Sequence, residues 1–127
     1  MMKKHLIYPE KVRRVPKQFS WVDHRLIRDH FIEQCSHQAL ALYLFLITVG
    51  DQQGLSYYSD RSVGARLAMD SVVLLRSRDE LIRAKLIAYR KPLYQVLSLE
   101  PLKPARSQID APLAVGQILR QLAGGTS

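Results

Sequence analysis

Hydrophobic and polar positions between residues 36 and 99 change period several times along the chain. Residues 39–47 are apolar on nearly every face of a helix, which is typical of a buried central helix, and Ser36 stands at its start. Residues 51–54 carry the residue types of a turn, and residues 55–58 alternate in the manner of a short strand. The pattern therefore predicts a helix, a turn and a strand.

Two further helices with their own N-cap residues follow this strand. Ser59 precedes a short helix that carries Val63 and Leu67, and Asp70 precedes a longer helix that reaches about Lys85. One face of the longer helix is predicted to contain Leu74, Ser77, Arg78, Leu81 and Lys85, and Leu75, Ile82 and Leu86 are expected to flank it.

Two strand-like runs, residues 86–89 and 94–99, are joined by residues 90–93 and predict a hairpin. The full order is then helix, tight turn, helix and hairpin. A helix that projects from a helix-turn-helix fits the major groove of DNA, and a basic hairpin beside it can reach the phosphate backbone.

The two ends of the chain have a different character. Residues 1–18 show no sustained period and contain two prolines, so we expect an extended arm. Residues 21–34 predict an additional helix, with Ser20 as its N-cap and Asp23 in a capping-box-like position. The apolar stripe of that helix consists of Val22, Leu26, Ile27 and Phe31.

The sequence divides into a basic arm at residues 1–18, one domain at residues 19–100 and a tail at residues 101–127. Prolines interrupt the start of the tail, and residues 113–123 predict a short amphipathic helix. Its apolar positions are Val115, Ile118, Leu119 and Leu122.

Positive charge is concentrated in two places. The formal net charge of the 127 residues is +8, and residues 1–20 hold six Lys or Arg against one acid. Residues 59–91 hold eight Lys or Arg against four acids, whereas residues 21–58 have a net charge of −2. An asymmetric basic surface favours a polyphosphate partner; the alternative is a basic protein whose charge serves only solubility.

Several classes of protein are not expected. Cys35 is the only cysteine, which excludes an intramolecular disulfide and a metal site built on paired cysteines and suits a reducing cytoplasm. We expect Cys35 itself to be a small buried apolar residue. The apolar run at residues 39–49 is shorter than the about 20 residues that cross a bilayer. The N-terminus has no apolar segment of a signal peptide. We therefore expect a cytoplasmic protein without a membrane partner.

The sequence gives no support for catalysis. The four histidines have no metal-binding spacing, the glycines form no phosphate-binding loop, and the adjacent carboxylates of Asp79 and Glu80 point in different directions on a helix. We expect no catalytic residue, no cofactor and no metal.

Residues 36–99 resemble a winged helix-turn-helix domain of the type found in bacterial replication initiators, phage replisome organisers and small regulators. The matching segments are residues 39–44, 54–59, 62–67, 69–70 and 79–87. The resemblance implies a fold that is mainly α with a small β-wing, here with an extra N-terminal helix. The chain departs from the family at Lys85, where glycine is usual, at Arg78, where an aliphatic residue is usual, and in its short wing.

The resemblance also implies which side chains meet double-stranded DNA. Arg76 is the best candidate for direct readout, because a guanidinium can bind guanine O6 and N7 together. The base-reading candidates are Ser71, Val72, Val73, Arg76 and Glu80. The backbone candidates are Arg61, Arg66, Arg83, Arg90 and Lys91, together with Lys11, Arg13, Arg14 and Lys17 of the arm.

Some alternatives remain open from the sequence. Arg78 interrupts an apolar stripe, and it either pairs with a carboxylate such as Asp23, Glu33 or Asp79 or contacts DNA. One alternative is a DNA-binding domain that acts as a transcriptional regulator or as an accessory in replication or in a mobile element. The other is a module that binds a protein partner through surfaces such as Val72 and Val73. A homodimer would use residues 21–34 or 113–123.

Overall fold

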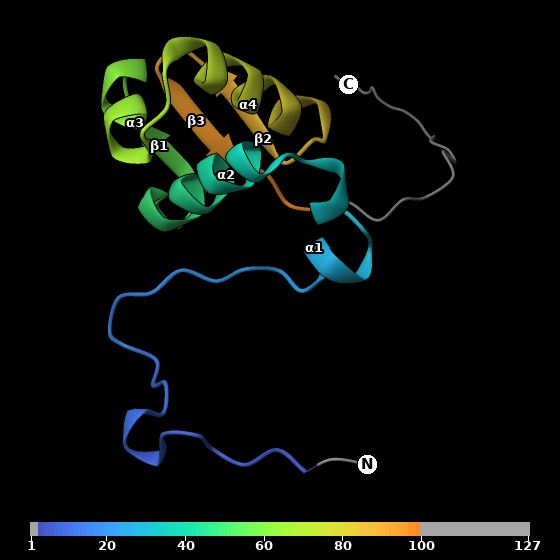
Figure 1. Ribbon diagram of the computed structural model, residues 1–127. Helices are drawn as coiled ribbons and strands as arrows, with labels where there is room; N and C mark the ends of the chain where they lie inside the picture. Colours follow the sequence, from blue (N-terminus) through green and yellow to red (C-terminus); the bar gives the residue numbers. More distant parts are fainter. Residues whose placement is uncertain (1–2, 100–127) are drawn as a thin grey trace, which may run out of the picture.

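The computed structural model describes residues 3–99 (Figure 1). Three long helices and the strands of a three-stranded antiparallel sheet follow one another in the order α-β-α-α-β-β. They are α2 (His37–Val49), β1 (Leu55–Tyr57), α3 (Asp60–Leu67), α4 (Ser71–Arg83), β2 (Ile87–Arg90) and β3 (Leu93–Val96). The predicted class, helices with a small β-sheet, is confirmed at this level.

The strand order is β1-β3-β2, so the last strand lies in the middle of the sheet. Tyr94 in β3 is opposite Ser56 in β1 and Tyr89 in β2. The sheet is short: β3 ends at Val96, although the sequence predicted a strand up to residue 99. The chain then stays close to the end of α4, because the Leu97 N–H donates to the Leu86 carbonyl at 3.0 Å.

All three long helices begin where their capping residues predicted. Ser36, Ser59 and Asp70 each have extended backbone angles, and each side chain accepts a hydrogen bond from the backbone N–H three residues later. The donor–acceptor distances are 3.1, 3.1 and 2.9 Å. Local hydrogen bonding therefore determines the start of each helix.

The core lies between α2, α4 and the inner face of the sheet. α2 contributes Ala39, Leu42, Tyr43 and Leu46, as expected of a central helix, but Leu44 is 60% exposed. Against them pack Val63, Leu74, Leu81, Leu86, Ile87 and Tyr94. The face predicted for α4 is confirmed for Leu74, Ser77, Arg78 and Leu81, which are its buried residues, but not for Lys85, which is exposed after the end of the helix.

A tight turn brings the chain from α2 into β1. The Asp51 carboxylate accepts hydrogen bonds from the backbone N–H groups of Gln53 and Leu55 at 2.8 and 2.9 Å. Gly54 has a φ of 81°, and a Cβ there would lie 2.7 Å from the Val96 carbonyl oxygen. Only glycine allows β1 to approach the end of β3 this closely.

The long helix predicted for residues 21–34 is wrong. The chain forms only α1 (Arg25–Arg28) and a 3₁₀ turn at Ile32–Gln34, separated by His30, whose φ is 64°. The Asp23 carboxylate accepts from the Arg25 N–H at 2.9 Å, a local bond that competes with helix formation. Of the predicted apolar stripe, only Leu26 is fully buried, so little core packing favours a longer helix.

α4 ends in a sharp turn at Lys85. Lys85 has a φ of 62°, in the left-handed region that favours glycine. The Lys85 and Leu86 N–H groups donate to the carbonyls of Ile82 and Leu81, both at 3.0 Å, which closes the last turn. Lys85 thus has the conformation that glycine would have, and the chain turns directly into β2.

The N-terminal arm lies apart from this fold. It is extended except for a 3₁₀ turn at Pro9–Lys11, and it leads away from the helices and the sheet (Figure 1). The segment predicted as an amphipathic helix, residues 113–123, lies outside the described residues. Within residues 3–99, no helix has the length and apolar character needed to cross a membrane.

Candidate nucleic-acid interface

The outward face of α4 carries most of the predicted reading residues. Ser71, Val72 and Arg76 are exposed, whereas Val73 is half-buried. Within residues 3–99, the Arg76 side chain has no hydrogen bond or ion pair. Its guanidinium is therefore available to a ligand.

Glu80, which the sequence proposed as a reading residue, is used inside the domain. Its Oε1 accepts from the Ser36 N–H at 2.7 Å, and its Oε2 accepts from the Ser36 hydroxyl at 2.9 Å. Both carboxylate oxygens are thus engaged at the start of α2, on the side of α4 that faces this helix. Glu80 is better described as a link between two helices than as a base-reading residue.

Arg78 has the structural role that the sequence offered as one alternative, but with a different partner. Its side chain is 8% exposed, and its Nη1 donates to Asp60 Oδ1 and to the Tyr94 hydroxyl, both at 2.8 Å. Its guanidinium carbon lies 4.1 Å from the centre of the Tyr89 ring. None of the predicted partners, Asp23, Glu33 and Asp79, pairs with it. Arg78 instead joins α4 to α3 and to the hairpin.

The electrostatics of this cluster favour the charged guanidinium. Burial opposes the charge of Arg78, but the hydrogen bonds to Asp60 and Tyr94 outweigh that effect and raise its pKa. Burial likewise raises the pKa of the Tyr94 hydroxyl, although its hydrogen bond to Arg78 acts in the opposite direction. The cluster is therefore one cation held by one anion and two aromatic residues.

Four of the predicted backbone-contacting cations lie on α3 and at the hairpin turn. Arg61 and Arg66 are exposed on α3, and Arg90 and Lys91 are exposed at the hairpin turn. The Tyr58 N–H donates to the Pro92 carbonyl at 3.2 Å, which places that turn next to the start of α3. Three of these cations, Arg61, Arg90 and Lys91, thus belong to adjacent segments.

Two groups of predicted cations are less clearly part of this surface. Arg83 forms an ion pair with Asp79 one turn earlier, at 2.7 Å, on the exposed side of α4. Lys11, Arg13, Arg14 and Lys17 are exposed in the arm, and within residues 3–99 no hydrogen bond or ion pair joins them to α4. The structure therefore brings the hairpin cations close to the start of α3, whereas the arm cations belong to a separate segment.

An exposed apolar stripe on α4 was not foreseen. Val72, Leu75 and Ile82 are 60%, 53% and 40% exposed, and Leu75 and Ile82 were expected to flank the buried face. Their spacing of three and seven residues places them on one side of the helix. Within residues 3–99 that side of α4 is left accessible.

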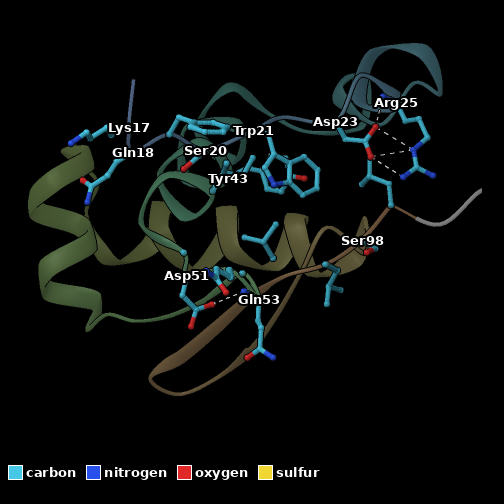
Figure 2. Close-up of a pocket in the computed structure, with 18 residues that line it drawn as sticks. Lys17, Gln18, Ser20, Trp21, Asp23, Arg25, Tyr43, Asp51, Gln53 and Ser98 are labelled. Atoms are coloured by element: carbon cyan, nitrogen blue, oxygen red, sulfur yellow. Dashed lines mark hydrogen bonds and ion pairs between the residues drawn. The ribbon is translucent and has the colours of Figure 1, made fainter. Parts of the chain in front are cut away.

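A cavity of about 870 Å³, which we call the groove, lies on another part of the domain (Figure 2). Its lining includes Phe19 and Trp21 at the base of the arm and Tyr43 of α2. The remaining lining comes mainly from Ile47, residues 50–54 and residues 96–99. A smaller hollow of about 340 Å³ lies between α3 and the start of α4.

Other chemistry is not assembled in the described part of the chain. No group of three or more His, Cys, Asp or Glu side chains there is arranged to hold a metal ion. Cys35 is half-buried, and burial raises the pKa of its thiol, to which the negative charge of Glu80 also contributes. This environment suits an unreactive packed thiol.

Comparison with protein-family models, curated proteins and solved structures gave no match to this chain. The functional argument therefore depends on the geometry described above.

Proposed function

We propose that this domain is a winged helix that binds double-stranded DNA, with α4 as the helix that enters the major groove. The observation that carries the proposal is the position of Arg76. It lies on the outward face of α4, within the first two turns, and has no partner within residues 3–99. A helix in the major groove contacts base edges mainly with its N-terminal turns.

Cations on the other two elements of the winged helix fit a DNA ligand. Arg61 and Arg66 on α3, and Arg90 and Lys91 at the hairpin turn, are exposed and would supply cations for the phosphates that flank the major groove. Ser71 at the start of α4 is exposed and small enough to approach a phosphate. Only Arg76 is a long, unpaired polar side chain on the outward face, so we infer modest sequence specificity, supplemented by DNA shape.

The biological role that we propose is that of a transcriptional regulator, or of an accessory in replication or in a mobile element, in a bacterial cytoplasm. This step depends on the resemblance of residues 36–99 to the winged-helix family. DNA binding itself depends on Arg76 and the surrounding cations.

A second candidate, a module that binds a protein partner, is favoured by one observation. Val72, Leu75 and Ile82 form an exposed apolar stripe next to Arg76 on α4. Apolar side chains are more common at protein interfaces than on a DNA-binding face, where only occasional contacts with thymine methyl groups use them.

Selection of bound duplexes from a random pool tests DNA readout by α4. If Arg76 reads a base, Arg76→Ala relaxes the preference at one position, at a cost of about 1–3 kcal/mol in binding. Lys91→Ala is the matched control, since loss of a phosphate contact weakens all sequences alike. A pool that stays unselected with the unmodified protein contradicts specific readout and favours the protein-binding alternative.

A further inference from the structure

Five large apolar side chains of the arm are uncovered. Leu6, Ile7, Tyr8, Val12 and Val15 are between 48% and 88% exposed, and the arm leads away from the fold that would otherwise cover them (Figure 1). Scattered apolar residues are normal on a surface, but a concentration of them usually marks an interaction site. The DNA-binding proposal leaves these side chains unexplained.

The groove is the complementary feature of the same chain. It lies between Phe19 and Trp21 at the base of the arm and Tyr43 and Ile47 of α2 (Figure 2). Phe19 and Trp21 are 64% and 74% exposed, so one wall of the groove is apolar and uncovered. Its volume of about 870 Å³ is large enough for several side chains.

We propose that the arm of one copy binds in the groove of a second copy, so that the protein forms a two-fold homodimer with exchanged arms. Two uncovered apolar surfaces would then cover each other. In a two-fold arrangement each copy supplies one arm and one groove, so both contacts form at once.

The direction of the arm favours a second copy over the chain's own groove. From Phe19 back to Leu6 an extended chain spans up to roughly 43 Å, which is long enough to reach another molecule. Residues 17–21 line the groove, and the rest of the arm leads away from the fold (Figure 1). It therefore reaches a neighbouring molecule directly, but would have to reverse its direction to enter its own groove.

The charges of the groove lining are balanced, and Asp51 is the acid left for an incoming arm. Lys17 and Arg25 stand against Asp23 and Asp51 in the lining, and Asp23 is paired with Arg25. Asp51 is exposed at the groove, where the cations of an incoming arm can approach it. A nucleic acid would attract those cations but would leave the apolar side chains of the arm uncovered.

The only tryptophan of the chain lies in the groove, which makes the test direct. The full chain is studied by sedimentation over a dilution series, and quenching of Trp21 fluorescence by acrylamide is measured on the same samples. We expect a dimer with protected Trp21, and monomers with several-fold stronger quenching on dilution. Ile7→Asp should weaken the dimer by roughly tenfold or more, because one apolar contact is lost from each groove.

Lys4→Gln is the matched control, since it changes the charge of the arm by the same amount but removes no apolar group. A mixture tests the exchange itself. Ile7→Asp retains an intact groove, and Phe19→Asp, at an exposed position in the groove wall, retains an intact arm. The two variants should be monomeric separately and should form a heterodimer with one arm–groove contact when mixed.

Three outcomes overturn the proposal. In the first, the full chain is monomeric and Trp21 is freely quenched at all concentrations. In the second, the Ile7→Asp variant dimerises as well as the unmodified chain. In the third, the unmodified chain is monomeric and Ile7→Asp exposes Trp21, which means that the arm occupies its own groove. None of these measurements involves DNA, so failure here and failure of the proposed function are distinguishable.

Discussion

Glu80 in α4 binds Ser36, the N-cap residue of α2, through two hydrogen bonds of 2.7 and 2.9 Å from the Ser36 N–H and hydroxyl to its carboxylate. The Ser36 hydroxyl in turn accepts from the Ala39 N–H at 3.1 Å. The orientation of α4 is thus coupled to the start of the central helix, 44 residues earlier in the chain.

Glu80→Ala should lower the free energy of unfolding by about 1–3 kcal/mol, because it removes two charge-assisted bonds and leaves the Ser36 N–H without its partner. Asp79→Ala is the control at the neighbouring position, where only an exposed ion pair with Arg83 is lost, and it should change stability by about 0.5 kcal/mol or less. Urea denaturation measures both. Equal effects of the two variants would show that the link contributes nothing.

Arg78 and Arg76 offer a second matched pair on opposite sides of α4. Arg78→Lys keeps the positive charge but loses the planar group that reaches Asp60 and stacks on Tyr89, so we expect a loss of about 1–3 kcal/mol in stability. Arg76→Lys should change stability by about 0.5 kcal/mol or less, since its side chain is exposed. Thermal unfolding monitored by circular dichroism distinguishes them. A tolerated Arg78→Lys would contradict the structural role of this guanidinium.

Lys85 has a left-handed conformation that costs a non-glycine residue about 1–2 kcal/mol. Lys85→Gly should therefore raise the free energy of unfolding by up to about 1 kcal/mol, after the greater entropy of glycine in the unfolded chain is taken into account. Arg83→Gly, within α4, should instead lower it by about 0.5–1 kcal/mol. Destabilisation by Lys85→Gly would mean that the lysine side chain itself contributes contacts at this turn.

Acid should weaken the contact between Asp23 and Arg25. The hydrogen bond from the Arg25 side chain holds the pKa of Asp23 at about 2, below its ordinary value of 3.8, and the Arg25 backbone N–H adds to this effect. A lowered pKa in the folded state means that the contribution to stability is fully present above about pH 4 and is lost as the pH falls towards 2. Titration of the Asp23 carboxyl by NMR tests the value, and Arg25→Gln should move the pKa back towards 3.8. An unchanged pKa in this variant would contradict the assigned cause.

The parts of the fold that depend on local signals could be predicted from the sequence. Ser36, Ser59 and Asp70 begin their helices because the capping bond forms within three residues. The helix predicted for residues 21–34 failed because its apolar stripe has almost nothing to pack against, and periodicity alone does not reveal this. The partners of Arg78 and Glu80, Asp60 and Ser36, were missed for a related reason: each pair is formed only by the packing of α4 against another helix.

The candidate site likewise combines features that local signals predict with features that only packing between elements determines. The outward position of Arg76 follows from helix periodicity once the start of α4 is known. The exposure of Leu75 and Ile82 does not follow from periodicity, because it depends on which neighbouring elements pack against α4. The groove could not be predicted either, since it is formed by the base of the arm together with α2 and the segment that follows β3.

Binding of the full chain to a random-sequence duplex, measured as a function of salt concentration, tests the central claim most directly. If Arg61, Arg66, Arg90 and Lys91 lie against phosphates around α4, the observed association constant falls steeply with salt, with a log–log slope of about −0.9 for each phosphate contacted. Lys91→Ala should reduce that slope by about one unit. Absence of detectable binding at low salt would contradict DNA binding by this domain.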